Sequence, residues 1–300
     1  MIRLVVDSIC DLHKSIVEKY NIAVLPLFVT IGEKSYRDEV DIHLDEVYSA
    51  MREGIVPMTS QISSGDTEAL FRSFCEAGDD IIYLSFSSGL SGTYQLAHII
   101  LNDLSSEYPD RKLKAVDSEA GSIGIALQAL QAARWIAQGK SYEYVLNGLY
   151  DMIPKTQHVF TLESLSWLAK GGRISPPAGY IGDKLQIKPV LDIKDKLLRV
   201  VGIVRGRKAA FKTLLNMLTE RAGDFDNQLI GIAHADDPDA AIAVEAMVKE
   251  KFPRAVTFIH PIGCVLGSHL GIGGVGILFL SAPVEGYDLP EEDVTNLSDI

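Results

Sequence analysis

The sequence contains few cysteines and no paired-cysteine motif. Its three cysteines, Cys10, Cys75 and Cys264, lie far apart in a chain of 300 residues. An odd number of scattered cysteines argues against a disulfide scaffold, and the lack of a CxxC pair argues against a structural zinc site. We therefore expect buried free thiols in a reducing cytoplasm and no bound metal.

Basic residues are also in short supply. The chain has 28 Lys and Arg residues against 40 Asp and Glu residues, which gives a formal net charge of −12. Nucleic-acid binding requires basic surfaces that replace the counterions of the phosphates. The composition therefore argues against a nucleic-acid partner.

Long uninterrupted apolar runs are missing as well. The run 265–283 contains five glycines and a histidine, whereas a membrane-spanning helix needs about 20 mostly apolar residues. The first residues, MIRLVVDS, lead straight into a strand pattern and do not resemble a signal peptide. We expect a cytoplasmic protein without a transmembrane segment.

Apolar residues make up 47% of the chain, and its mean hydropathy is +0.14. This content supports sizeable hydrophobic cores, and the length favours two domains. Pro154 ends a helical pattern, so we place the boundary there. We expect an N-terminal domain over 1–155, a C-terminal domain over 156–281 and an acidic tail over 282–300.

The pattern of expected elements is that of an α/β protein. In the first half, strands alternate with helices, which predicts a mostly parallel sheet with helices on both faces. The second half predicts a smaller mixed α/β domain with a β-hairpin over 187–204. The tail carries acidic but no basic residues, so we expect a solvated extension. Further expected elements are a helix capped near Asp11, a strand over 23–31 and a helix over 163–170.

The segment 81–101 reads as a strand, a Ser/Gly loop and an amphipathic helix. This order places Ser91 and Gly92 at a helix N-terminus, where free N–H groups and the helix dipole favour an anion. The same loop nearly matches the nucleophile elbow G-x-S-x-G, but Thr93 occupies the last position. We favour an anion-binding loop over a nucleophile, for which His269 would be the best candidate base.

A second glycine-rich segment, 271–276, formally matches the dinucleotide fingerprint G-x-G-x-x-G. That fingerprint requires a following helix, whereas the pattern here predicts a strand, so we reject a nucleotide site. His269 lies just before these glycines and is either a packing residue or a ligand-binding residue. The sequence leaves both interpretations open.

Two further features stand out. Thr59 lies upstream of a capping segment and is not needed as a cap. The segments 170–175 and 205–208 are compact basic clusters in an acidic chain. They are either solvated surface charge or a phosphate or partner site, since guanidinium groups recognise phosphate well.

Together these motifs resemble those of the DegV family, over about residues 1–281. Each piece alone is weak, but their order along the chain is specific. The matching segments are Val5-Val6-Asp7-Ser8 with Asp11-Leu12, Thr59-Ser60-Gln61 before Ser64-Gly65, Ser88 to Tyr94, Asp117-Ser118, Gly171-Gly172-Arg173-Ile174, Arg205-Gly206-Arg207-Lys208 and Gly267-Ser268-His269 with Gly271.

The resemblance implies a fatty-acid-binding protein that has no catalytic activity or cofactor of its own. It would hold a long-chain fatty acid at the domain interface while a separate kinase subunit forms the acyl phosphate for phospholipid synthesis. Carried over by motif, Thr59, Ser91 and His269 bind the carboxylate, with the Gly92 backbone close by. The basic positions linked to phosphoryl handling or kinase docking are Arg173 and Arg205. Two departures from the family pattern are Ser268, where Thr is common, and Ile62, where Pro is common.

Two other functions remain open at this stage. One is a serine esterase or lipase that uses Ser91 as nucleophile and His269 as base. The other is a regulatory adaptor that binds a partner through the basic face around Arg173 and Arg205.

Overall fold

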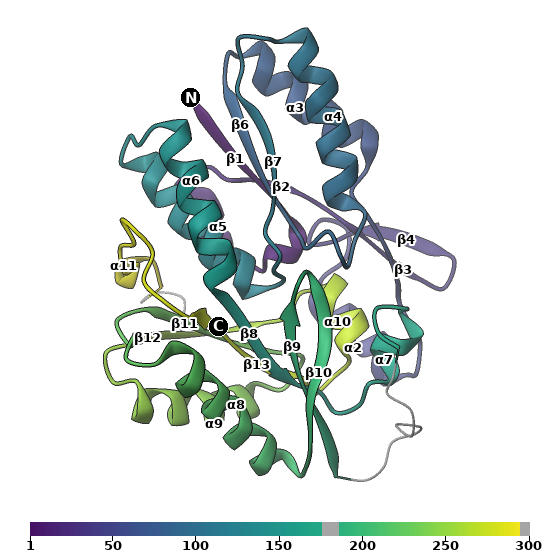
Figure 1. Ribbon diagram of the computed structural model, residues 1–300. Coiled ribbons are helices and arrows are strands. Elements are labelled where there is room, and N and C mark those ends of the chain that lie inside the picture. The colour runs from purple at the N-terminus through teal and green to yellow at the C-terminus, as the bar shows by residue number, and fades with distance from the viewer. Residues whose placement is uncertain (176–185, 295–300) are drawn as a thin grey trace.

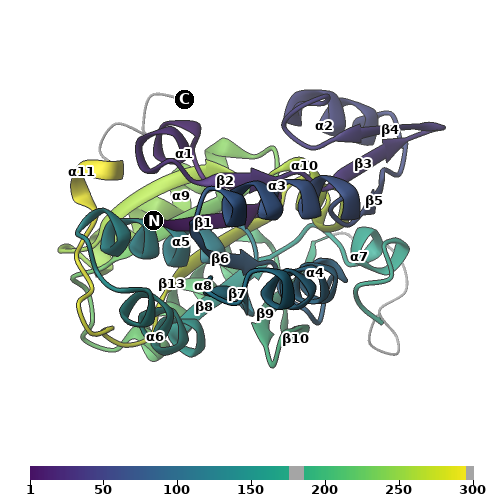
Figure 2. The ribbon, with the colours of Figure 1, turned by 90° about the horizontal axis from the view of Figure 1, so that it is seen from above.

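The computed structural model describes residues 1–175 and 186–294, which fold into three sheets and the helices that cover them (Figure 1). A four-stranded parallel sheet has the order β2-β1-β6-β7, and a six-stranded mixed sheet has the order β10-β9-β8-β13-β11-β12. A three-stranded antiparallel sheet has the order β4-β3-β5, and its β3–β4 hairpin projects beside α2 (Figure 2). The strands are β1 (Ile2–Asp7), β2 (Ala23–Leu25), β3 (Phe28–Ile31), β4 (Lys34–Arg37), β5 (Met58–Ser60), β6 (Asp80–Ser85), β7 (Leu113–Asp117), β8 (Thr156–Thr161), β9 (Ile187–Lys194), β10 (Leu197–Arg205), β11 (Leu229–His234), β12 (Val256–Pro261) and β13 (Val275–Leu280). The helices are α1 (Lys14–Tyr20), α2 (Leu44–Arg52), α3 (Ser64–Glu76), α4 (Thr93–Glu107), α5 (Ile123–Ala137), α6 (Tyr142–Met152), α7 (Ser166–Lys170), α8 (Arg207–Ala222), α9 (Pro238–Lys251), α10 (Cys264–Leu270) and α11 (Glu291–Val294), with short 3-10 helices at Ser8–Cys10 and Ile153–Lys155.

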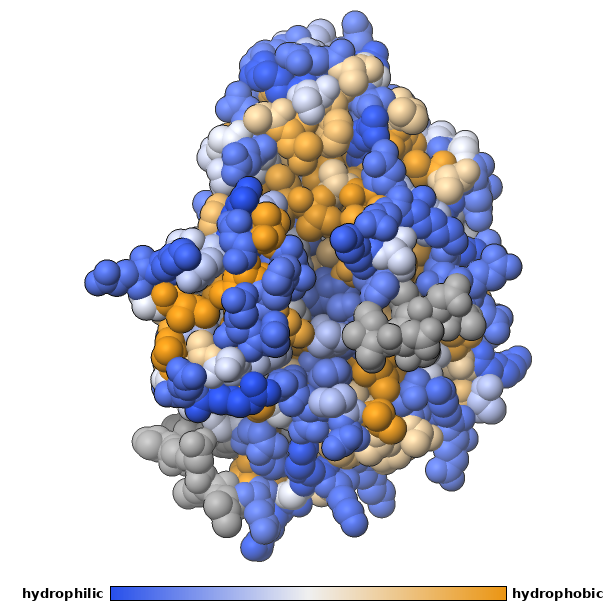
Figure 3. Space-filling model, turned by 180° about the vertical axis from the view of Figure 1, so that it is seen from behind, coloured by the Kyte–Doolittle hydropathy of each residue, from blue (hydrophilic) through white to orange (hydrophobic). Residues whose placement is uncertain are grey.

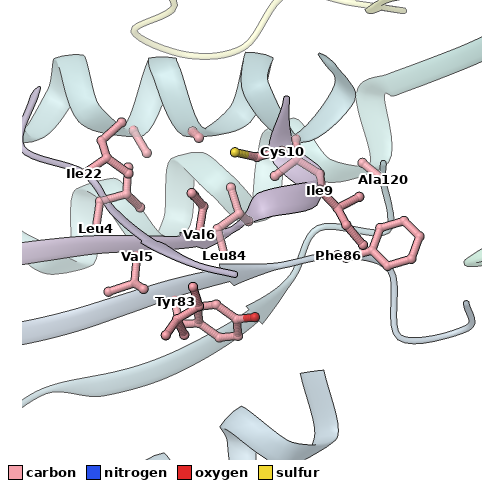
Figure 4. Close-up of a cluster of buried hydrophobic side chains, with 14 of the residues drawn as sticks. Leu4, Val5, Val6, Ile9, Cys10, Ile22, Tyr83, Leu84, Phe86 and Ala120 are labelled. Atoms are coloured by element: carbon pink, nitrogen blue, oxygen red, sulfur yellow. The ribbon is translucent and has the colours of Figure 1, made fainter. Parts of the chain in front are cut away.

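The four-stranded sheet is buried on both faces, as the near-continuous apolar strands predict. Figure 1 shows α5 and α6 on one side of it and α3 and α4 on the other. In Figure 4, Leu4 and Val6 of β1 point to one face, whereas Val5 and Tyr83 point to the other. All four side chains are at most 4% exposed. The expected parallel sheet with helices on both faces is confirmed.

Helix α5 lies between the two large sheets and contacts strands of both. Nearly all of its residues are buried, because a helix packed on two sides has no solvent face. Glycines allow the close approach: a Cβ on Gly124 would lie 2.1 Å from His158, and a Cβ on Gly231 would lie 2.2 Å from Ile123. Helix α5 therefore fixes how the two sheets face each other.

The six-stranded sheet forms the second, mixed α/β unit. Its β9–β10 pair is the expected antiparallel hairpin, and α8 and α9 cover the face away from α5. Although this unit comes from the shorter half of the chain, its sheet is the larger one.

Three expected elements differ from the structure. The strand expected over 23–31 is broken into β2 and β3, which belong to different sheets, because Pro26 cannot donate a ladder hydrogen bond. Helix α7 starts only at Ser166. Helix α1 has its cap near Asp11, as expected, but the capping residue is His13, and Asp11 itself is buried in a left-handed conformation.

The tail was expected to be solvated. Its described residues Glu285, Asp288, Glu291 and Glu292 are exposed, in line with this expectation, but Asp293 is buried. The carboxylate of Asp293 is fully buried, where it forms ion pairs with Lys19 at 2.5 Å and Arg134 at 2.5 Å. Tyr20 donates a hydrogen bond to the same group at 2.9 Å. Residues 295–300 lie outside the described part of the chain.

Two general expectations concern thiols and membranes. The three cysteines are free and buried, as expected. No helix within residues 1–175 and 186–294 combines the length and apolar character needed to cross a bilayer.

Candidate functional site

An apolar cavity lies between the six-stranded sheet and the loops at the carboxyl ends of the four-stranded sheet. Its walls include Phe86 from the first half of the chain and Leu162, Val265 and Leu278 from the second half. The space inside, together with its opening to solvent, is about 910 Å³. On the surface seen from behind, hydrophobic residues gather on the upper half among hydrophilic ones (Figure 3).

Thr59 and His269 meet at one end of this cavity. Their Oγ1 and Nε2 atoms are 2.7 Å apart, although 210 positions separate the two residues in sequence. Thr59 lies on β5, and His269 lies in the last turn of α10. The imidazole also packs on Gly171, where a Cβ would lie 2.1 Å from Nδ1. Three segments that are distant in sequence therefore build this end of the cavity.

Burial, and after it the positive charge of Arg173, lower the pKa of His269 to about 4. The imidazole is therefore neutral at physiological pH and acts as a hydrogen-bonding group rather than as a cation. Its Nδ1 atom is buried and has no partner among the described residues.

Ser91 lines the same cavity, immediately before the N-terminus of α4. Its Oγ is 2.9 Å from Thr93 Oγ1 and accepts a hydrogen bond from the Thr93 N–H at 3.3 Å. The preceding loop is anchored to the sheet because Asp7 accepts from the Phe86 N–H at 2.8 Å and Asp117 accepts from the Ser88 N–H at 3.1 Å. The strand–loop–helix segment expected over 81–101 is confirmed, and it aims a helix N-terminus at the cavity end.

Arg173 also lines the cavity, and it marks the opening. Its Nη1 donates to the Gly171 carbonyl at 2.6 Å, and its Nε donates to the Leu90 carbonyl at 3.4 Å. Outside the cavity, a polar recess is lined by residues that include Arg173, Gly92 and Leu197. Arg173 therefore lines both the cavity, with Thr59 and Ser91, and the outer recess.

Of the two remaining expected site residues, Gly92 adjoins Ser91 at the N-terminus of α4, whereas Arg205 lies apart. Gly92 lines the outer recess rather than the cavity, and its missing Cβ leaves room for the Gln61 amide, which would otherwise be 2.5 Å away. Arg205 is exposed at the far end of β10. It lies eight residues beyond Leu197 of the recess, roughly 26 Å at ~3.3 Å per residue of strand.

Asp11 is a positioning residue, in addition to lying near the cap of α1. One carboxylate oxygen accepts from the Gly263 N–H at 3.1 Å, and the other accepts from the Ser122 hydroxyl. Gly263 is the N-cap residue of α10. Asp11 therefore pairs with a backbone N–H at the start of the helix that carries His269. Only its place in the motif with Asp7 signals this role in the sequence.

The geometry of a serine hydrolase is not present among the described residues. Ser91 Oγ pairs with Thr93, and His269 Nε2 pairs with Thr59. No carboxylate contacts His269 Nδ1 in the described part of the chain. A triad needs a base bonded to the nucleophile and an acid that orients the base.

Replacing Gly171 by Ala should disrupt the site. The new Cβ would meet the imidazole at 2.1 Å, so His269 must move and its hydrogen bond to Thr59 must break. We expect the affinity for an anionic ligand to fall about tenfold, because the ligand loses one hydrogen bond to its charged group. The control is Gly65→Ala, because a Cβ there meets nothing within 4 Å. Equal ligand affinities in the two variants would contradict this geometry.

Comparisons with known proteins agree with this architecture. Residues 1–282 match the family model described as "Uncharacterised protein, DegV family". A DegV domain-containing protein of Clostridium perfringens is 38% identical over 277 residues, which cover 91% of this chain and 95% of the relative. A stearic acid-binding protein of Eubacterium ventriosum superposes with a TM-score of 0.84 at 30% identity, over 94% of this chain and 99% of that one. A fatty-acid-binding DegV family protein of Thermus thermophilus gives the same TM-score of 0.84, identity of 30% and coverage of 94% and 99%.

Proposed function

This chain belongs to the DegV family, and we propose that it binds a long-chain fatty acid with the carboxylate at the Thr59–His269 end of its cavity. The acyl chain occupies the apolar remainder between the two sheets. The observation that carries the proposal is the joining of an apolar cavity to one polar end. The fatty-acid-binding relatives of the same fold support it.

The polar end suits a carboxylate that leaves water. A buried carboxylate without partners costs several kcal/mol. The hydroxyls of Thr59 and Ser91 can donate to it, the neutral His269 can orient the Thr59 hydroxyl by donating to it, and the nearby N-terminus of α4 favours negative charge. These donors offset the desolvation of the headgroup.

The apolar walls account for affinity. Each buried methylene contributes about 0.8 kcal/mol, so a long chain gains far more from the cavity than a short one. The headgroup site then fixes orientation, with the carboxyl group near the opening that Arg173 marks.

We further infer that the protein is a cytoplasmic, non-catalytic subunit without a cofactor, and that a separate kinase phosphorylates the carboxylate of the lipid it holds. The acyl phosphate then enters phospholipid synthesis. The polar recess outside the cavity supports this role, because the carboxylate oxygen must reach the terminal phosphorus of the donor, which it attacks while the nucleoside diphosphate leaves. Arg173 stands where the transferred phosphate would emerge, and Arg205 offers a second, exposed basic group for docking.

Charge reversal at these arginines separates binding from presentation. In Arg173→Glu and Arg205→Glu, we expect acyl-phosphate formation by an added fatty acid kinase to fall at least tenfold, because close charge pairs across an interface contribute roughly 1.5–7 kcal/mol. Arg205→Glu should keep full fatty-acid affinity, since Arg205 lies outside the cavity. The control is Lys114→Glu, an exposed change at the opposite end of the four-stranded sheet. Undiminished phosphorylation in both arginine variants would refute the docking role.

A further inference from the structure

A group of metal-binding side-chain types lies outside the cavity, where the turn after β4 meets the start of α10. One carboxylate oxygen of Asp38, one of Glu39 and the sulfur of Cys264 all lie within 4.8 Å of one another. The Cys264 Sγ atom is 3.8 Å from Glu39 Oε1. This is close to the roughly 3.6 Å between two ligands of a tetrahedral zinc ion with bonds of ~2.3 and ~2.1 Å.

Asp38 provides the observation that points to a ligand at this place. Its side chain is 1% exposed, and its Oδ1 atom is buried without a hydrogen-bond partner among the described residues. Ser8 and Cys264 hydrogen-bond to the same carboxylate, but they leave this oxygen unpaired. Buried polar atoms nearly always find a partner, so the unpaired oxygen beside a thiol and a second carboxylate calls for a cation.

The charge balance at this point also favours a cation. In the described part of the chain, no Lys, Arg or His forms an ion pair with Asp38, Glu39 or the nearby Asp11. The Cys264 thiol lies within reach of both Asp38 and Glu39, but it carries one proton and can donate to only one of them. Buried carboxylates are normally paired or coordinate a metal.

We propose that Asp38, Glu39 and Cys264 bind one divalent cation of the zinc type, through two carboxylates and one thiolate. Sulfur is a ligand that zinc accepts and that magnesium and calcium avoid. Cys264 loses its proton to solvent when the ion binds, and water completes the coordination. Glu39 is exposed, so the ion can enter from that side. The proposal does not depend on lipid binding.

The position of this site gives the ion a structural role. Asp38 and Glu39 follow β4, whose sheet also contains β5 with Thr59. Cys264 is the first residue of α10, and His269 lies in the last turn of that helix. A bound ion therefore joins the sheet that carries Thr59 to the helix that carries His269. No local pattern signals the site, because 225 positions separate Glu39 from Cys264; the expectation of no metal rested on the lack of a CxxC pair.

The test titrates metal-free, untagged full-length protein with Zn²⁺ in competition with a coloured chelator, and with Co²⁺ followed by absorption. We expect one Zn²⁺ per chain and, with Co²⁺, the charge-transfer absorption of a cobalt–thiolate bond. Mg²⁺ and Ca²⁺ should bind at least about tenfold more weakly, because they prefer oxygen ligands. A protein that does not bind Zn²⁺ at micromolar concentrations would overturn the inference, as would Ca²⁺ or Mg²⁺ binding as tight as that of Zn²⁺.

Two variants identify the ligands. Glu39→Gln and Cys264→Ser should each lower the Zn²⁺ affinity at least about tenfold, since even an outer-shell partner of a metal contributes ~10- to 100-fold. Cys264→Ser should also abolish the cobalt–thiolate absorption, whereas Cys75→Ser, the matched control at a buried thiol on α3, should retain it. Unchanged Zn²⁺ affinity in both ligand variants would overturn the site. Should Cys264→Ser fail to fold, the exposed change Glu39→Gln and the cobalt spectrum of wild type decide.

Asp38→Asn provides a third, independent readout. Without metal, this substitution only removes a buried carboxylate, whereas with Zn²⁺ it also removes a ligand. We therefore expect a ~100-fold excess of Zn²⁺ over its Kd to raise the Tm of wild type by roughly 5 °C and to leave the Tm of Asp38→Asn nearly unchanged. The same Zn²⁺-induced rise in both proteins would overturn the assignment of Asp38 as a ligand.

Discussion

Removing the hydroxyl of Thr59 or Ser91 should weaken fatty-acid binding by roughly ten- to a hundredfold, because a hydrogen bond to a charged group contributes about 1.5–3 kcal/mol. Thr59→Ala should have the larger effect. It deletes one donor and also deprives His269 Nε2 of its only described partner, 2.7 Å away. Ser91→Ala removes a donor at the start of α4 but leaves His269 in place.

Affinity for a long-chain fatty acid, measured by isothermal titration of delipidated protein, checks this expectation. Thr213→Ala is the matched control, because its hydroxyl donates to a carbonyl within the exposed part of α8. Unfolding curves show whether the variants remain folded. Wild-type affinity in both Thr59→Ala and Ser91→Ala would show that the carboxylate binds elsewhere.

A second large effect is expected at Asp38, whose side chain lies beside Cys264 at the start of α10. Asp38 is 1% exposed, and its Oδ1 has no partner among the described residues. Burial raises the pKa of this carboxyl from 3.8 to about 6. A raised pKa in the folded state means that folding favours the protonated acid. The stability it contributes is complete below pH 3.8 and is lost as the pH rises through about 6.

Asp38→Asn should therefore raise the free energy of unfolding more above pH 7 than near pH 4. The shift of about two pKa units corresponds to about 3 kcal/mol. Urea unfolding of wild type and variant at both pH values measures this difference. Besides burial, the charge of Asp38 raises the pKa values of the buried Asp7 and Asp11, so their response to Asp38→Asn adds to the stabilisation at high pH. Asp103→Asn, an exposed change on α4, serves as control. If the substitution changes the unfolding free energy equally at both pH values, ionisation of Asp38 does not destabilise the folded protein.

The parts of the fold that follow local pattern were predictable. The segment from β6 to α4 was anticipated because its strand is continuously apolar and its helix has a clear apolar face. The elements that the sequence did not reveal are β5 and α10. β5 has three residues, too few for a periodic signal. α10 contains weak helix formers, and its first turn depends on Asp11, which is distant in sequence.

The resemblance supplied candidate residues for the site but not their assembly. Family resemblance singled out Thr59, Ser91 and His269, and the structure brings all three to one cavity. Their meeting depends on tertiary contacts, such as the packing of His269 on Gly171, which no local pattern encodes. The buried ion pairs of Asp293 were missed for the same reason, since an acidic run reads as solvated until its partners are known.

Mass spectrometry of the purified protein tests fatty-acid binding most directly. The protein is measured first in its native state and then after denaturation and extraction with organic solvent. We expect one fatty acid per chain in the native mass, released only on denaturation, and the released molecule identifies the acyl chain. A native mass equal to that of the polypeptide, unchanged after incubation with long-chain fatty acids, would contradict the proposed function.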